Sequence, residues 1–182
     1  MKKILLIITI LNILGGFYGC TDNGRSLKNF KNKDLTENGI PLSIKVPSGT
    51  KIVEDTAKRV LNLMEKGLEI KGDYYHIRVE KILKEYQNPR LDVHEIKDAR
   101  LSLEKKISHK GEFDKVIQED PQGFIFTTKM EPHGKTYHFF YVTIAEGRQI
   151  EFTDYFSVME KQTEQDVRLM YESIKQAGDS EK

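Results

Sequence analysis

The stretch TYHFFYVTIA, at residues 136–145, decides the fold because its apolar side chains lie on both sides of a strand. One side carries Tyr137, Phe139 and Tyr141, and the other carries His138, Phe140, Val142 and Ile144. Side chains alternate between the two faces of a sheet, and a strand that is apolar on both faces must be covered on both. We therefore predict that this segment lies centrally in an antiparallel sheet with a helix on each face.

Further strands are predicted on either side of this one along the sequence. Apolar alternation between turn residues indicates strands at residues 42–46, 50–54, 68–71, 74–81, 113–119, 124–130 and 149–156. The joining turns include Pro47-Ser48-Gly49, Gly72-Asp73 and the Pro- and Gly-containing stretches at 120–123 and 131–134. Gly72 at the first central position predicts a two-residue hairpin that needs positive φ.

Two helices complete the pattern. The first is predicted to begin at Asp92 with Glu95 as its capping-box partner, and Ile96, Ala99, Leu103 and Ile107 would form its apolar side. The second is capped by Thr163 with Asp166, and its apolar residues are Val167, Met170, Tyr171 and Ile174. Residues 56–66 have helix-like spacing before Gly67, and a strand is the alternative there.

These segments predict one domain of the α+β class, a three-layer α/β/α sandwich around a central antiparallel sheet. The domain would span residues 40–177, with a polar tail at 178–182. A domain of this length buries roughly two-thirds of its surface and needs no disulfide.

The composition excludes several classes of protein. The 182 residues include 29 Lys and Arg against 28 Asp and Glu, so the chain lacks the basic excess with which nucleic-acid binders displace counterions. The single Cys cannot form an internal disulfide, and cannot by itself build a Cys-rich zinc site or an iron–sulfur cluster.

The N-terminus has the organisation of a signal peptide. Lys2 and Lys3 precede an apolar run at residues 4–14, which the stretch GGFYG at 15–19 and then Cys20 follow. Even residues 4–18 would form a helix of only about 22 Å, shorter than the roughly 30 Å hydrocarbon core of a bilayer. A permanent membrane span is therefore the weaker interpretation.

Gly19-Cys20 at the end of this segment resembles the lipobox of bacterial lipoproteins. The resemblance implies that the Cys20 thiol receives a diacylglycerol, that residues 1–19 are removed, and that the new amino group takes a fatty acyl chain such as palmitate. It also implies a membrane-anchored protein of the bacterial cell envelope. Thr21, rather than Asp, does not indicate retention in the inner membrane, so the outer membrane is expected. The alternatives are a secreted or periplasmic protein, an uncleaved anchor, or a buried cysteine.

Residues 20–39 are predicted to carry the lipidated Cys and a flexible tether. The segment is rich in Asn, Lys, Gly and Asp, and Leu27, Phe30 and Leu35 are too sparse for a packed face. As flexible coil, residues 21–39 would reach about 24 Å. Removal of residues 1–19 would leave 27 of the 29 basic residues against 28 acidic ones, so acyl chains rather than bulk charge would hold the protein on the membrane.

No catalytic or metal-binding pattern stands out in the sequence. His94 and Asp98 are four residues apart, and Glu131 and His133 lie near His138, but the paired spacing of zinc ligands is missing. We interpret these residues as solvated polar side chains and one packed strand histidine. We therefore expect no cofactor, no metal site and no catalytic site.

The strand aromatics provide the one candidate for a ligand groove. Tyr137, Phe139 and Tyr141 could line it where residues 56–66 fail to cover the sheet. Their period-two spacing is explained more simply by a packed core.

The order of elements resembles the PsbP-like fold. The resemblance rests on an opening strand that ends in VPSG, the hairpin LEIKGDYYHIRV, a charged helix, the meander FDKVIQEDPQGFIFTTKMEPHGKTYHFFYVTIAEGRQIEF and the closing helix TEQDVRLMYESIK. This family includes the photosystem extrinsic subunit P, Ran-binding relatives and bacterial lipoproteins. It implies a non-catalytic role in protein binding or assembly, with an envelope protein as partner. The alternatives are a carrier or chaperone for an apolar ligand or segment and, third, an enzyme.

Overall fold

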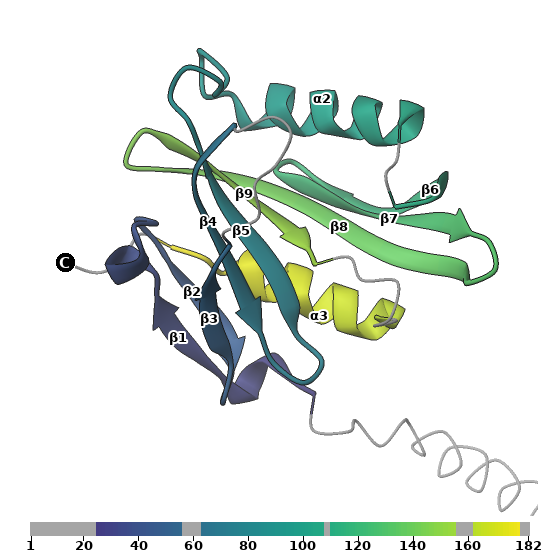
Figure 1. Cartoon of the computed structure of the whole chain (residues 1–182), viewed down its shortest axis with the longest axis horizontal. Coiled ribbons are helices and arrows are strands. Elements are labelled where there is room, and N and C mark those ends of the chain that lie inside the picture. The colour runs from purple at the N-terminus through teal and green to yellow at the C-terminus, as the bar shows by residue number, and fades with distance from the viewer. Residues whose placement is uncertain (1–24, 56–62, 108–109, 156–161, 179–182) are drawn as a thin grey trace, which may run out of the picture.

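The computed structural model describes residues 25–55, 63–107, 110–155 and 162–178 (Figure 1). Within these residues the chain forms nine strands and two α-helices. The strands are β1 (Phe30–Asp34), β2 (Ser43–Pro47), β3 (Lys51–Glu54), β4 (Met64–Lys71), β5 (His76–Ile82), β6 (Glu112–Asp120), β7 (Gly123–Met130), β8 (Gly134–Ala145) and β9 (Arg148–Asp154). The helices are α2 (Val93–Lys106) and α3 (Glu164–Ile174), and two short 3₁₀ turns are η2 (Leu27–Asn29) and η3 (Thr36–Asn38). The protein therefore belongs to the α+β class.

The main sheet is antiparallel throughout and has the strand order β3-β4-β5-β9-β8-β7-β6. β8 lies between β9 and β7, so the prediction of an interior strand at residues 136–145 is confirmed. The predicted turns at 120–123 and 131–134 also join the expected strands.

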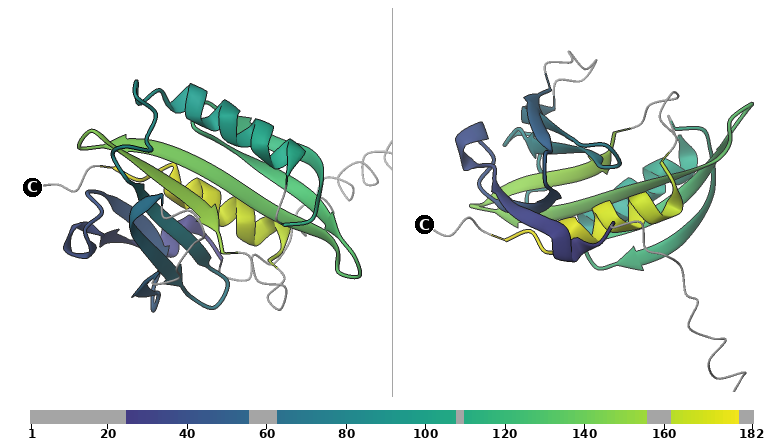
Figure 2. Two further views of the ribbon diagram at one scale, coloured as in Figure 1. Left: turned by 45° about the horizontal axis from the view of Figure 1, so that its top comes forward. Right: turned by 90° about the horizontal axis from the view of Figure 1, so that it is seen from below.

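Each face of β7 and β8 is apolar and packs against a different helix. Phe124, Phe126, Phe140 and Val142 form one cluster with Ile96 and Leu101 of α2. Ile125, Phe139 and Tyr141 belong to the other cluster, with Val167, Met170, Tyr171 and Ile174 of α3. Figure 1 and the left view of Figure 2 show α2 and α3 on opposite sides of these strands. The two helices therefore cover the two apolar faces of β8.

The N-terminus of α3 forms as predicted. The Thr163 hydroxyl accepts a hydrogen bond from the Asp166 backbone N–H, and the Asp166 carboxylate accepts one from the Thr163 backbone N–H. This capping box satisfies two of the backbone donors that a helix leaves unpaired at its start.

The apolar side predicted for α2 is wrong. Ile96 is buried, but Leu103 is 49% exposed and Ile107 is 60% exposed. The helix instead turns Leu101 inward, together with Lys97 and Glu104. Lys97 reaches Glu119 at 2.6 Å and Glu104 reaches Arg100 at 2.9 Å, so ion pairing allows two charged residues outside the predicted apolar side to be buried. Asp92 caps the helix, whereas Glu95 contacts Asn88 and Arg90.

Substitutions on α2 test which of its sides faces the sheet. We expect Leu101→Ala to lower the free energy of unfolding by about 2 to 3 kcal/mol, because it leaves a cavity against Phe140 and its neighbours. Leu103→Ala should change it by less than about 0.5 kcal/mol, because that side chain is half exposed. Denaturant unfolding measures both values, and equal losses would mean that the helix is rotated.

The segment assigned to a flexible tether differs most from the prediction. β1 pairs antiparallel with β2 from Phe30↔Pro47 to Asp34↔Ser43, and Phe30 and Leu35 are buried in the main core cluster. Few apolar residues suffice here because β2 supplies backbone hydrogen bonds and the core accepts two anchoring side chains. The folded part thus begins before residue 40, while Cys20 and residues 21–24 lie outside the described residues. At the other end, Gly178 of the predicted polar tail pairs with Ser43.

Two local predictions also change. Met64–Lys71 is strand β4, so residues 64–66 are not helical, and residues 56–62 lie outside the described residues. The β4–β5 hairpin is present, but its connection is four residues long, and Gly72 does not have positive φ. Tyr75 fills the core at the end of this longer connection, and its hydroxyl lies 2.9 Å from that of Ser173 on α3.

Candidate functional site

The aromatic residues predicted as a ligand groove lie beneath α3. Phe139 is fully buried and Tyr141 is 6% exposed. The ring of Tyr171 packs edge-on against both, at centroid distances of 6.0 and 5.8 Å. Tyr137 is partly buried against the same cluster. These residues therefore form core and no open groove, because α3 occupies the face that the groove required.

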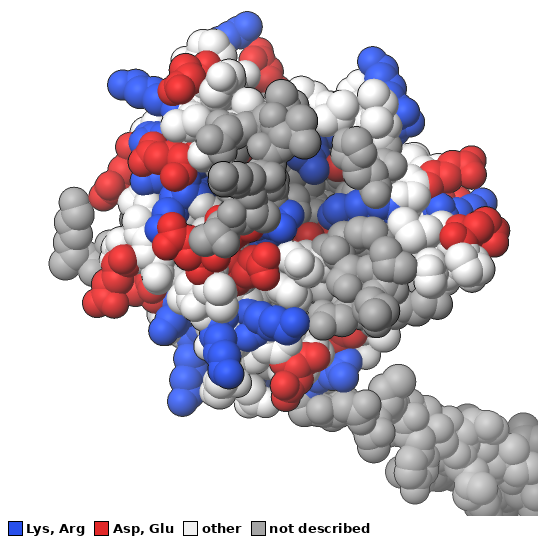
Figure 3. All heavy atoms as spheres, in the orientation of Figure 1, with Lys and Arg blue, Asp and Glu red and all other residues white. Residues whose placement is uncertain are grey.

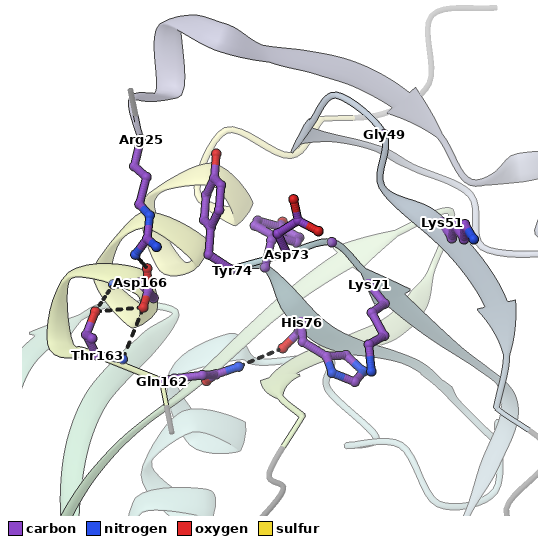
Figure 4. Close-up of a pocket in the computed structure, with 12 residues that line it drawn as sticks. Arg25, Gly49, Lys51, Lys71, Asp73, Tyr74, His76, Gln162, Thr163 and Asp166 are labelled. Atoms are coloured by element: carbon purple, nitrogen blue, oxygen red, sulfur yellow. Dashed lines mark hydrogen bonds and ion pairs between the residues drawn. The ribbon is translucent and has the colours of Figure 1, made fainter. Parts of the chain in front are cut away.

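A cleft of about 640 Å³ opens instead at the tip of the β4–β5 hairpin (Figure 4). Its walls come from the start of the described chain, the β2–β3 turn, the hairpin tip and the N-terminus of α3. The charged residues that line it are Arg25, Lys51, Lys71, Asp73 and Asp166, with Tyr74 and His76 between them. A smaller hollow of about 270 Å³ shares its hairpin wall and extends to Asn29.

The β2–β3 turn positions one wall of this cleft. Gly49 has a φ of 84°, a conformation that residues with a Cβ rarely adopt. Thr50 closes the turn by donating its hydroxyl to the Pro47 carbonyl at 2.6 Å. The tight reversal places Lys51 at the first position of β3, beside the hairpin.

Two lysines form the cationic side of the cleft. Lys51 and Lys71 are directly opposite each other in the antiparallel pairing of β3 with β4, and both side chains are exposed. Like charges at opposed positions destabilise a sheet. Figure 4 shows both lysines on the side of the cleft away from Arg25.

Arg25 ties the beginning of the described chain to α3. Its guanidinium donates to the Asp166 carboxylate at 2.6 Å and lies 4.7 Å from the centre of the Tyr74 ring. Asp166 is the capping-box residue of α3, so its second oxygen is held by the Thr163 hydroxyl at 2.7 Å. The described chain therefore begins at a residue that α3 holds beside the cleft.

His76 forms the floor of the cleft and is almost completely buried. Its ring stacks on Tyr155 at a centroid distance of 4.0 Å, and its Nε2 lies 3.4 Å from Glu69. Its backbone carbonyl accepts from the Gln162 amide at 3.4 Å. The floor is thus held by packing, while the lysines stand at the rim.

A second polar cluster lies inside the domain, around the carboxylate of Asp154. Lys110 donates to it at 2.8 Å, the Phe139 backbone N–H donates at 3.0 Å, and His138 Nδ1 lies at 2.9 Å. Burial alone would raise the pKa of Asp154, but the charges of Lys110 and His138 and their hydrogen bonds outweigh it and lower the pKa below its usual value.

The cluster continues to the hydroxyls of β7 and β8. His138 Nε2 lies 2.9 Å from the Thr136 hydroxyl and 3.2 Å from that of Thr128. A hydroxyl, an imidazole and a carboxylate in this order resemble the arrangement of a hydrolase triad. Thr128 and His138 are fully buried, however, and Thr128 also donates to the Lys110 carbonyl at 2.6 Å. The cluster therefore joins β7, β8, β9 and the segment after α2, and we assign it a structural role.

The residues weighed as metal ligands do not converge. His94 is exposed on α2, whereas His138 is the packed strand histidine that the sequence predicted. In the described ranges, no group of three or more His, Cys, Asp or Glu side chains could hold a metal ion. No helix in the part of the chain that the structure describes is long and apolar enough to cross a membrane.

Sequence reasoning missed the cleft for an identifiable reason. Lys51 and Lys71 were both placed on predicted strands, but the sequence did not show that these two strands pair and bring the lysines opposite each other. Arg25 and Asp166 are 141 residues apart, and no local pattern connects them. The cleft emerges only when the N-terminal segment packs on the hairpin and α3. Searches among family models, curated proteins and solved structures found no match to this chain.

Proposed function

We propose that this protein is a lipoprotein of the bacterial cell envelope, held on a membrane through lipid on Cys20, whose α+β domain is a non-catalytic binding module. The observation that carries the proposal is Gly19-Cys20, the only cysteine, directly after an apolar segment that two lysines precede. A thiolate is the nucleophile that a thioether-linked diacylglycerol requires. The proposed location is the outer membrane.

The position of Arg25 supports this proposal. Only residues 21–24 separate Cys20 from a side chain that is ion-paired with α3. Lipid on Cys20 would therefore hold the folded domain directly at the membrane surface. Two or more acyl chains are needed for stable anchoring, because a single chain binds only reversibly.

We further propose that the domain has the three-layer α/β/α architecture and the PsbP-like order of elements, with an envelope protein as its binding partner. The clusters that α2 and α3 form on opposite faces of β7 and β8 support the layering. The partner role is supported by the apolar side chains of Leu103 and Ile107, which remain exposed on the side of α2 away from the sheet. Fold alone does not determine function, so the partner must be identified by experiment.

Replacement of Cys20 tests the anchor. Cells grown with an alkyne-bearing fatty acid are expected to label the wild-type chain and to recover it with the membranes. Cys20→Ser should remove the label and the membrane association, because serine offers no thiolate for the thioether. Click detection after membrane fractionation measures both.

A matched control keeps the thiol and changes a neighbouring residue. Thr21→Ser should label as the wild type does, since it alters the residue after Cys20 by one methyl group. Wild-type protein without label would contradict the proposed lipidation. Crosslinking followed by gentle detergent extraction of the wild type and Cys20→Ser then identifies the partner, which should be recovered with the anchored form only.

A further inference from the structure

We propose that the cleft at the tip of the β4–β5 hairpin binds the phosphate of an anionic lipid headgroup in the membrane that carries the protein. This inference rests on the proposed lipid anchor at Cys20, and it adds a ligand and an orientation. The chemical group that the cleft would recognise is a phosphate monoanion next to hydroxyl groups. This phosphate belongs to the headgroup of phosphatidylglycerol or of a lipid of the same type.

The length of chain between the anchor and the cleft limits their separation. Arg25 lies on the rim of the cleft and is held by Asp166. Five residues of fully extended chain span at most about 18 Å, so the α-carbon of Arg25 stays within about 18 Å of that of Cys20. The rim of the cleft must remain close to the headgroups.

The same limit orients the domain. A domain of about 150 residues has a radius of gyration of about 15 Å, and therefore a diameter of roughly 40 Å. The link is shorter than this diameter, so the domain cannot turn its far side to the bilayer. The end with Arg25, η2 and the tip of the hairpin faces the membrane, and α2 lies on the far side of the main sheet (Figure 1).

The distribution of charged residues agrees with this orientation. Residues 25–51 contain six basic side chains and two acidic ones. The basic residues are Arg25, Lys28, Lys31, Lys33, Lys45 and Lys51, and the acidic ones are Asp34 and Glu37. Figure 3 shows Lys and Arg side chains at the lower left of the molecule, where β1 to β3 lie in Figure 1, with acidic side chains beside them. The near-neutral chain thus has a basic end beside its proposed anchor, and basic residues near an anionic leaflet attract it.

The lining of the cleft matches a phosphate that carries hydroxyl groups. Lys51 and Lys71 offer two ammonium groups at opposed sheet positions, and an ammonium binds phosphate as a point charge. Asp73 lines the same cleft and is exposed, so its carboxylate can accept hydrogen bonds from hydroxyls of the headgroup. Tyr74 combines an apolar ring with a polar tip, a type of side chain that is enriched at membrane interfaces. A bare phosphate would use only the lysines, whereas a glycerol headgroup would use Asp73 as well.

Titration of the full chain in uncharged dodecyl maltoside micelles tests the inference. The ligands are short-chain dihexanoyl phosphatidylglycerol, dihexanoyl phosphatidylcholine and inorganic phosphate, and calorimetry or the NMR shifts of Tyr74 and Asp73 report binding. We expect phosphatidylglycerol to bind at least tenfold more tightly than either other ligand. The double substitution K51Q/K71Q should weaken its binding tenfold or more, and K51R/K71R should restore it.

The matched control K105Q/K106Q removes two exposed lysines of α2 and should bind as the wild type does. The inference is overturned if phosphatidylglycerol does not bind, if K51Q/K71Q binds equally well, or if inorganic phosphate binds as tightly, which would indicate a site for free phosphate. Mass spectrometry of the same sample reads Cys20 separately. Unmodified Cys20 would contradict the anchor, whereas lost lipid selectivity with an acylated Cys20 would overturn the headgroup site alone.

Discussion

Asp154→Asn is expected to lower the free energy of unfolding by about 3 to 5 kcal/mol, because it removes the negative charge of a buried ion pair with Lys110. The Asp154 side chain is 1% exposed, and that of Lys110 is 14% exposed. Asparagine has nearly the same shape but offers one acceptor oxygen to Lys110 and the Phe139 N–H together. Its amide group would also face His138 Nδ1, which lies 2.9 Å from the native carboxylate. Denaturant unfolding at neutral pH measures the loss.

The control for this substitution is Asp98→Asn. Asp98 pairs with Lys97 at 2.9 Å, but its side chain is 69% exposed. Exposed ion pairs contribute about 0 to 1 kcal/mol, so the loss should be at most about 1 kcal/mol. Similar losses for the two variants would contradict the account of Asp154 as the buried centre of the cluster.

Acid should also lower the free energy of unfolding by protonating the Asp154 carboxylate. The pKa of Asp154 is lowered in the folded protein, so the unfolded chain, with a usual aspartate pKa of about 3.9, binds this proton more readily. The stabilisation is therefore complete above about pH 4 to 5 and declines as the pH falls further. Asp154→Asn removes this contribution, and its stability should fall less steeply in acid than that of the wild type.

Phe139→Ala is expected to cost about 3 to 5 kcal/mol, the range for a large aromatic side chain removed from a core. Phe139 has no exposed surface, and it lies opposite Ile125 on β7 and beneath Tyr171 of α3. The surrounding sheet and helix cannot collapse into the space without moving several strands. Equilibrium unfolding measures the loss.

This substitution also distinguishes a packed core from the groove that the sequence allowed. A side chain that lines an open groove would cost little when truncated, since water would fill the space. Tyr86→Ala is the control, because Tyr86 is 57% exposed and should change stability by less than about 0.5 kcal/mol. A loss below about 1 kcal/mol for Phe139→Ala would indicate that Phe139 lines an open groove.

The parts of the fold that could be predicted depend on residues that are close together in the sequence. The doubly apolar strand at residues 136–145 had to be covered on both faces, and it is. The Thr163 and Asp166 cap is a contact between residues three apart, so the sequence determines it directly. Alternation and turn residues likewise located most strands of the main sheet.

The wrong predictions have a common physical cause, which is long-range pairing. Hydrophobic spacing placed Leu103 and Ile107 inward, yet the ion pair of Lys97 with Glu119, 22 residues away, allowed α2 to present another side. Composition assigned Phe30 and Leu35 to a tether, yet β2 and the core hold them in place. In each case a partner elsewhere in the chain outweighed the local pattern.

The candidate site could be predicted only in part. The sequence identified Cys20 as the lipid attachment residue, which remains a prediction. It did not identify the cleft, because Arg25, Lys71 and Asp166 meet only through the packing of the N-terminal segment, the hairpin and α3. The buried cluster was also missed, since Lys110 and Asp154 are 44 residues apart.

Intact-mass spectrometry of the protein purified from bacterial membranes tests the central claim most directly. We predict a chain that begins at Cys20 and carries a diacylglycerol on the sulfur and an acyl chain on the amino group. A mature chain whose Cys20 bears no lipid, or a chain that retains residues 1–19, would contradict the account.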